Sequence, residues 1–136
     1  MRWIAYLRVY GLYAGAEQKL TPRLIGRPVG ILRGNRVLDL SLEAARSGVT
    51  IGSKIRQAQQ DCPEITLVRF EEARYREFVR APLEICAGFT PQVESVTGYE
   101  IFLDLSGPRE PRALLEEILH KIVPGLGFTA RVGVST

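Results

Sequence analysis

The order of the expected elements predicts an α+β protein, with a ferredoxin-like sheet, helices on one face of that sheet and a small inserted subdomain. A strand and a short helix are expected within residues 1–20. Residues 71–136 then read as helix, strand, strand, helix and strand. If residues 21–70 are left out, the remaining elements follow the split β-α-β order. A sheet of this kind leaves one face open for a ligand. Residues 21–70 form the insertion.

The first strand is expected over residues 3–10, because apolar side chains alternate along it. One face of this strand is expected to carry Trp3, Ala5, Leu7 and Val9. Gly11 closes the strand, and a short helix follows over residues 13–20. Thr21-Pro22 stops that helix, since proline disfavours a helical residue before it.

The inserted segment alternates short strands and short helices. Strands are expected over residues 29–32, 36–39 and 65–68, the first two joined by a turn at residues 33–35. Ser41 is expected to cap a helix that ends at Gly48. Ser53 is expected to cap a second helix, which stops before Cys62-Pro63.

Two longer helices belong to the remaining part of the chain. The first is expected over residues 71–87, where Pro82 should bend or interrupt it. Strands at about 91–97 and 99–105 follow it. The second helix, at about 110–122, has an apolar stripe and should end at Pro124, and residues 128–134 form the last strand.

Composition indicates a folded, mildly basic protein of the cytoplasm. The 136 residues are 46% hydrophobic, and 15 Arg and 3 Lys give a net charge of +3, which permits contact with nucleic acid without demanding it. Cys62 and Cys86 lie far apart and are expected to be reduced and buried rather than zinc ligands or a disulfide. His120 is expected at the surface of a helix. No apolar run reaches the length of a membrane span.

The segment Val96–Ser106 is the most informative part of the sequence. It reads as a strand that carries Glu100 and Asp104 among aliphatic residues. It resembles the catalytic strand of the Y-family translesion DNA polymerases, which runs Ser-hydrophobic-Asp-Glu-Ala-Tyr-Leu-Asp. Glu100 and Asp104 match this pattern, and Tyr99 stands where the family has a metal-binding Asp.

Five further segments resemble family motifs in the right order, so the resemblance covers most of the chain. They are Leu12–Gln18, Pro22–Val29, Glu43–Val49, Cys62-Pro63 with Tyr75-Arg76-Glu77, and Arg131–Ser135. The resemblance implies a palm-like domain of residues 1–20 and 71–136, a fingers-like insertion of residues 21–70, and the absence from this sequence of the thumb and the C-terminal DNA-gripping domain. Whether the chain is part of a longer protein stays open.

The chemistry of the family is damaged in this chain. Active relatives hold two magnesium ions with three carboxylates, and hard ions of this kind need oxygen ligands. The resemblance places Arg8 and Tyr99 at two of these three positions and leaves only Glu100. Arg8 keeps its positive charge at any useful pH and repels a divalent ion. An internal ion pair between Arg8 and Glu100 is expected instead, the alternative being that both side chains point to water.

The nucleotide site looks equally altered. The family contacts the triphosphate with a Tyr and an Arg, and the matching positions are Leu42 and Ala45, whose side chains donate no hydrogen bond. Tyr13 matches the aromatic residue that excludes ribonucleotides, and its ring is expected to serve packing. The DNA-binding candidates are basic residues of the insertion: Arg27, Arg33, Arg36, Lys54 and Arg56.

The resemblance is closest to the ImuB group, and it implies a non-catalytic adaptor in DNA repair and damage-induced mutagenesis, without a cofactor. Its implied partners are DNA, bound weakly by this chain, a sliding clamp, a RecA-like accessory protein and an error-prone polymerase. One alternative is an active polymerase that holds magnesium with shifted carboxylates, Glu94, Glu100 and Asp104. Another is a protein-interaction module without a DNA role, which a salt-dependent DNA-binding assay would separate from the adaptor.

Overall fold

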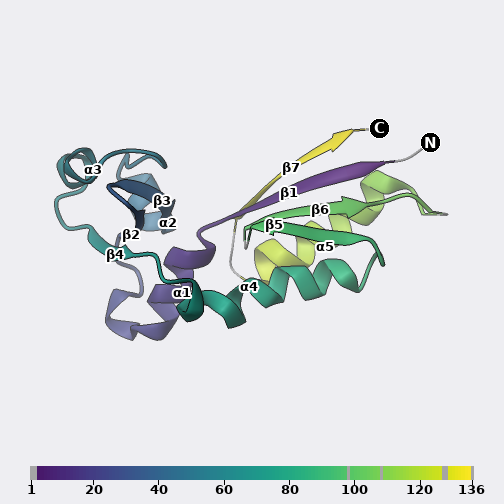
Figure 1. Ribbon diagram of the computed structural model, residues 1–136, viewed down its shortest axis with the longest axis horizontal. Helices are drawn as coiled ribbons and strands as arrows, with labels where there is room; N and C mark the ends of the chain where they lie inside the picture. The colour runs from purple at the N-terminus through teal and green to yellow at the C-terminus, as the bar shows by residue number, and fades with distance from the viewer. Residues whose placement is uncertain (1–2, 98, 108, 127–128, 136) are drawn as a thin grey trace. The chain divides into compact units, whose positions relative to one another are not determined.

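The computed structural model describes residues 3–97, 99–107, 109–126 and 129–135 (Figure 1). Its chain divides into two compact units, the first formed by Met1–Tyr10 and Val79–Thr136 and the second by Gly11–Phe78. Residues 11–20 and 71–78 therefore group with the inserted segment. The palm-like and fingers-like domains remain predictions.

The first unit is built on an antiparallel sheet in the order β5-β6-β1-β7. Its strands are β1 (Ile4–Tyr10), β5 (Val93–Thr97), β6 (Glu100–Asp104) and β7 (Thr129–Ser135). The strands predicted from the sequence are confirmed, with ends shifted by a few residues; Phe128 lies outside the described residues. The chain order of strands and helices confirms the ferredoxin-like sheet.

Helices cover one face of this sheet. Figure 1 draws α5 (Pro111–Leu126) and the C-terminal part of α4 (Glu72–Ala87) along the same side of it. The core between sheet and helices contains Ala5, Leu7 and Val9 of β1, Ile101 and Leu103 of β6, Cys86 of α4, and Leu114, Leu115, Ile118 and Ile122 of α5. The alternate side chains of β1 and β6 therefore lie on the opposite, partly exposed face.

Pro82 does not interrupt the first long helix, and Pro124 does not end the second. α4 continues through Pro82, which lies inside the helix and is buried. Tertiary packing therefore holds a helix together across a residue without an N–H donor. α5 continues past Pro124 to Leu126, since a proline in the last turn removes only its own backbone donor.

The second unit surrounds a smaller sheet in the order β3-β2-β4. Its strands are β2 (Val29–Arg33), β3 (Arg36–Leu40) and β4 (Thr66–Arg69), with β4 parallel to β2. The helices are α1 (Leu12–Leu20), the 3₁₀ turn η1 (Pro22–Leu24), α2 (Leu42–Arg46) and α3 (Ile55–Asp61). Gly34 turns the β2–β3 hairpin with a φ of 64°, a left-handed conformation that glycine adopts without strain.

One of the two predicted helix caps is confirmed and the other is wrong. The Ser41 hydroxyl accepts a hydrogen bond from the Ala44 N–H and caps α2. α3 is instead preceded by Lys54, because the Ser53 hydroxyl donates to the Thr50 carbonyl at 2.7 Å. Across the described ranges, every helix is too short or too polar to cross a membrane.

Candidate functional site

The register of the first sheet brings three predicted site residues together on its open face. Arg8 of β1 lies directly opposite Glu100 of β6, which confirms that they occupy neighbouring strands. The carbonyl of Tyr99, the residue before Glu100, accepts a hydrogen bond from the Val9 N–H at 2.8 Å. On the other side of β1, the register partner of Arg8 is Arg131 in β7. Arg8 therefore stands between one acidic and one basic register partner.

The Glu100 carboxylate is held by a tyrosine of β1. Its Oε2 accepts a hydrogen bond of 2.9 Å from the Tyr6 hydroxyl, and the Tyr6 ring lies 5.2 Å from the Phe102 ring. Burial and, next, the hydrogen bond to Glu100 raise the pKa of Tyr6 above its ordinary value. Tyr6 therefore remains a protonated donor to this carboxylate at neutral pH.

The Arg8 guanidinium lies between two aromatic rings. Its carbon Cζ is 5.0 Å from the centre of the Tyr10 ring and 5.2 Å from that of Tyr99. Both distances lie within the range of cation–π attraction. Its Nε is buried and has no hydrogen-bond partner within the described part of the chain. The ion pair between Arg8 and Glu100 stays a prediction.

This donor set does not fit the two magnesium ions that active relatives use. A hard divalent ion needs several oxygen ligands. Here Glu100 is the one carboxylate among the three matching positions, and one of its oxygens already accepts from Tyr6. Arg8 adds a permanent positive charge opposite it. Within residues 3–97, 99–107, 109–126 and 129–135, no three acidic, histidine or cysteine side chains are arranged to hold a metal ion.

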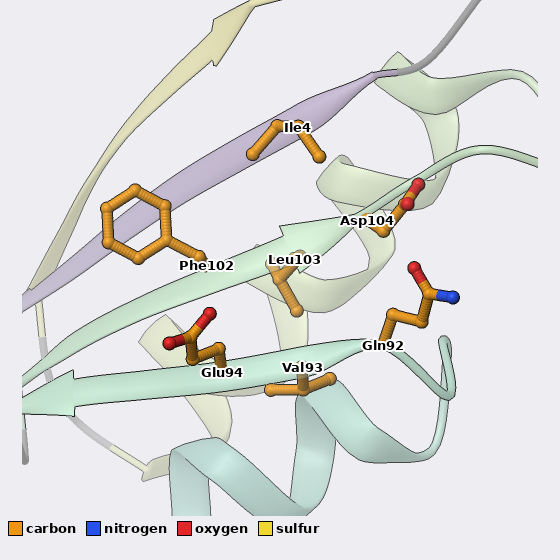
Figure 2. A pocket seen from close by; sticks show the side chains of 7 residues that line it. All are labelled: Ile4, Gln92, Val93, Glu94, Phe102, Leu103 and Asp104. Carbon is orange, nitrogen blue, oxygen red and sulfur yellow. The ribbon is translucent and has the colours of Figure 1, made fainter.

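Two of the carboxylates named for the alternative polymerase site line an open cavity of about 380 Å³. Figure 2 shows Glu94 beside Phe102 and Asp104 beside Gln92. Glu94 is the register partner of Phe102, and an Asp104 oxygen accepts from the Ser106 N–H at 2.8 Å. The remaining lining residues are Ile4, Val93 and Leu103, so Glu100 is not part of this cavity.

The predicted nucleotide-site residues lie in the second unit. Tyr13 is buried, and its ring lies 5.0 Å from both the Phe70 ring and the Tyr75 ring. Leu42 and Ala45 are exposed on α2. These contacts favour the packing role expected for Tyr13.

Asp39 of β3 is a site residue that the sequence did not reveal. Its two carboxylate oxygens accept hydrogen bonds from the N–H groups of Gly11, Tyr13 and Ala14 at 2.9, 2.9 and 3.0 Å. These amides open α1, which has no capping side chain of its own. Burial raises the pKa of Asp39, and the backbone hydrogen bonds act in the opposite direction. The signal available in the sequence was an acidic residue between two leucines of a strand.

A second buried acid, Glu17, joins α1 to α4. Arg74 donates two hydrogen bonds of 2.9 Å to its two oxygens, and the Tyr75 hydroxyl donates a third of 2.9 Å. Burial alone would raise the pKa of Glu17, but the hydrogen bonds from Arg74 and Tyr75 outweigh it and lower that pKa. The carboxylate is therefore held in its ionised form.

Three of the five basic DNA-binding candidates are brought together. Arg33 and Arg36 face each other across the β2–β3 turn, and Arg36 forms a backbone bridge with Lys54. Arg69, which sequence reasoning missed, joins them by donating to the Gly34 carbonyl at 3.4 Å. Arg33, Arg36, Lys54 and Arg69 are called the basic cluster below. Arg27 and Arg56 are exposed elsewhere in the same unit.

Comparison with known proteins gives consistent matches. A profile of the impB/mucB/samB family matches residues 9–136. DNA polymerase IV 2 of Mesorhizobium japonicum is 33% identical over 90% of this chain, and DNA polymerase iota of Mus musculus is 32% identical over 92%. The chain spans 30% and 17% of the lengths of these two relatives.

Solved structures show the same fold at lower identity. A ternary complex of Dbh matches 98% of this chain with a TM-score of 0.76 and 23% identity. A post-insertion binary complex of Dbh DNA polymerase matches 98% with a TM-score of 0.79 and 22% identity. The chain spans 41% and 42% of these two structures.

Proposed function

Because the chain belongs to the impB/mucB/samB family and has the fold of a Y-family DNA polymerase region, we propose that it acts in DNA damage tolerance without synthesising DNA. Its role in this proposal is that of an adaptor, which binds DNA and partner proteins of the damage response. The implied protein partners are a sliding clamp, a RecA-like accessory protein and an error-prone polymerase.

The observation that carries this proposal is the guanidinium of Arg8 opposite Glu100. Polymerisation depends on divalent cations that neutralise the attacking and leaving oxygens. The Arg8 guanidinium at this register position repels such ions. The rings of Tyr10 and Tyr99 hold the guanidinium in place. The residues of this face therefore support binding of a partner better than they support metal-dependent chemistry.

Asp39 gives independent support from the second unit. Backbone N–H groups at the start of a helix are a general site for phosphate and other anions. In this chain the amides of Gly11, Tyr13 and Ala14 already donate to Asp39. A triphosphate beside Tyr13 would compete with an internal carboxylate for the same donors.

Primer extension tests the non-catalytic part of the proposal. The full chain should incorporate no nucleotide on an undamaged or a damaged template, with Mg²⁺ or Mn²⁺, and calorimetry should detect no binding of Mn²⁺. The double variant Arg8→Asp with Tyr99→Asp restores two carboxylates beside Glu100 and should bind Mn²⁺ measurably. Incorporation by the unaltered chain would contradict the proposal and favour the polymerase that uses Glu94, Glu100 and Asp104.

The adaptor role needs a separate binding test. The immobilised chain is presented with purified sliding clamp, RecA-like protein and error-prone polymerase, each alone. Saturable binding of at least one is expected. If all three fail to bind while the chain still binds DNA, the adaptor part is wrong and a DNA-binding role remains.

A further inference from the structure

We propose that Arg8 binds a phosphate group of a nucleic-acid backbone on the open face of the sheet β5-β6-β1-β7. This inference rests on the proposed non-catalytic function, since it gives the cation that replaces a metal ligand a positive role. It also predicts a nucleic-acid contact in the first unit. This contact is separate from the basic cluster of the second unit.

The Arg8 guanidinium carries a buried donor that the described residues leave unsatisfied. Its Nε is buried without a hydrogen-bond partner in the described ranges. Buried donors in folded proteins are nearly always paired, and such an exception calls for an explanation. A guanidinium presents its N–H groups as a planar fork that matches two oxygens of a phosphate. A phosphate bound at this side chain would supply the acceptor that the described residues do not give to Nε.

Two aromatic rings hold the Arg8 side chain in place. The Tyr10 and Tyr99 rings lie 5.0 and 5.2 Å from Cζ of Arg8. Arginine stacks on aromatic rings without using its N–H groups, so these remain available to an oxygen ligand. A side chain that is held in place before binding loses less conformational entropy when it binds.

The acidic register partner of Arg8 is already engaged by another side chain. The Glu100 carboxylate accepts a hydrogen bond of 2.9 Å from the Tyr6 hydroxyl.

The phosphate source that fits best is the backbone of nucleic acid. The chain has a net charge of +3 and belongs to a family whose named relatives are DNA polymerases. Contacts to backbone phosphates need only positive charge and hydrogen-bond donors, so they survive the loss of metal ligands.

Fluorescence anisotropy with a labelled single-stranded oligonucleotide tests the proposal in the full chain, over a series of salt concentrations. Arg8→Gln should weaken binding by about tenfold and reduce the slope of log affinity against log salt by about 0.7. Arg112→Gln is the matched control, because Arg112 is exposed on α5 in the same unit and the charge change is identical. Its affinity should stay within about twofold of the unaltered chain.

A second probe separates phosphate from base. An oligonucleotide with an uncharged methylphosphonate backbone should bind the unaltered chain and the Arg8→Gln variant equally weakly. Equal affinity of the unaltered chain for the charged and uncharged oligonucleotides would overturn the proposal and indicate bases stacked on Tyr10 and Tyr99. Unchanged affinity and salt slope in Arg8→Gln, or no binding by the unaltered chain, would overturn it as well.

Two further variants keep the test decisive. If Arg8→Gln does not fold, as judged by its thermal unfolding midpoint, Arg8→Lys replaces it. The lysine variant should bind more weakly at an unchanged salt slope, because it keeps the charge and loses the planar fork. Tyr99→Leu should also weaken binding, and unchanged binding in both variants overturns the inference. Nucleotide incorporation by the unaltered chain would instead overturn the proposed function, whatever Arg8 does to DNA binding.

Discussion

The Asp39 carboxylate caps the N-terminus of α1, although Asp39 belongs to β3 and not to that helix. The residue before α1 is Gly11, whose φ of 77° is left-handed and which has no side chain to accept a hydrogen bond. Asp39 therefore accepts from the first amides of a helix that lies about 25 residues earlier in the chain. Asp39 is 6% exposed, so water has little access to this cap.

Asp39→Asn should destabilise the second unit by about 1–3 kcal/mol, because an amide nitrogen would replace one acceptor and face backbone donors. Urea unfolding followed by circular dichroism measures this change. Asp61→Asn is the matched control, since Asp61 accepts only from the exposed Gln57 amide among the contacts described. It should change stability by less than about 0.5 kcal/mol. Equal effects of the two variants would refute the capping role of Asp39.

Between elements, the Glu17 carboxylate links α1 to the start of α4. Arg74 and Tyr75 are neighbours in sequence and both donate to it, so a short segment of α4 holds both oxygens. The Tyr75 ring also contacts Phe70 and Tyr13. The link therefore combines a charged hydrogen-bond pair with aromatic packing.

This link makes stability depend on pH. The folded state lowers the pKa of Glu17 below its ordinary value. The stabilisation is therefore present above the unfolded pKa and is lost as the pH falls through the folded pKa. Urea unfolding from neutral pH to about pH 3 should show this loss, and Glu17→Gln should flatten the dependence. Glu64→Gln, at an exposed position, should leave the curve unchanged; a Glu17→Gln curve parallel to that of the unaltered chain would contradict the prediction.

For the molecule as a whole, positive charge is distributed over both units. The basic cluster gathers at one end of the sheet β3-β2-β4, and Arg8 lies in the sheet of the other unit. The net charge of +3 is modest, so any affinity for nucleic acid must come from such local groups and must fall with salt.

The triple variant Arg33→Gln, Arg36→Gln and Lys54→Gln should weaken binding of duplex DNA. The slope of log affinity against log salt should fall by about 0.9 for each cation that contacts a phosphate. Anisotropy titrations at several salt concentrations measure both quantities. A charge-matched control replaces Arg109, Arg112 and Lys121 of the other unit by Gln and should retain the slope. Indistinguishable slopes for the two triple variants would exclude the cluster as a DNA contact.

The sheet and its helices were predictable because they depend on local periodicity. β1 alternates buried and half-buried residues, and the stripe on α5 buries Leu114, Leu115 and Ile118, both as the sequence indicated. The continuation of α4 through Pro82 was not predictable, because packing rather than propensity decides whether a helix continues through a proline.

The contacts of the site depended on partners far apart in the chain. Asp39 bonds to Gly11 across 28 residues and Arg74 to Glu17 across 57. Periodicity does not report such distances. The positions of Arg8 and Glu100 on neighbouring strands were predictable from the motifs, whereas the Tyr6 hydroxyl and the tyrosine rings around Arg8 appear only in three dimensions.

The outer strand of the larger sheet has a consequence for self-association. β5 stands at the end of the strand order, and its pairing with β6 slips between Ser95 and Thr97. Such a bulge bends the free row of backbone donors and acceptors, and Glu94 adds a charge beside it. An edge strand that is both bent and charged pairs poorly with the same strand of a second molecule. The β5 edge is therefore less suited to the edge-to-edge pairing by which open sheets stack into fibrils.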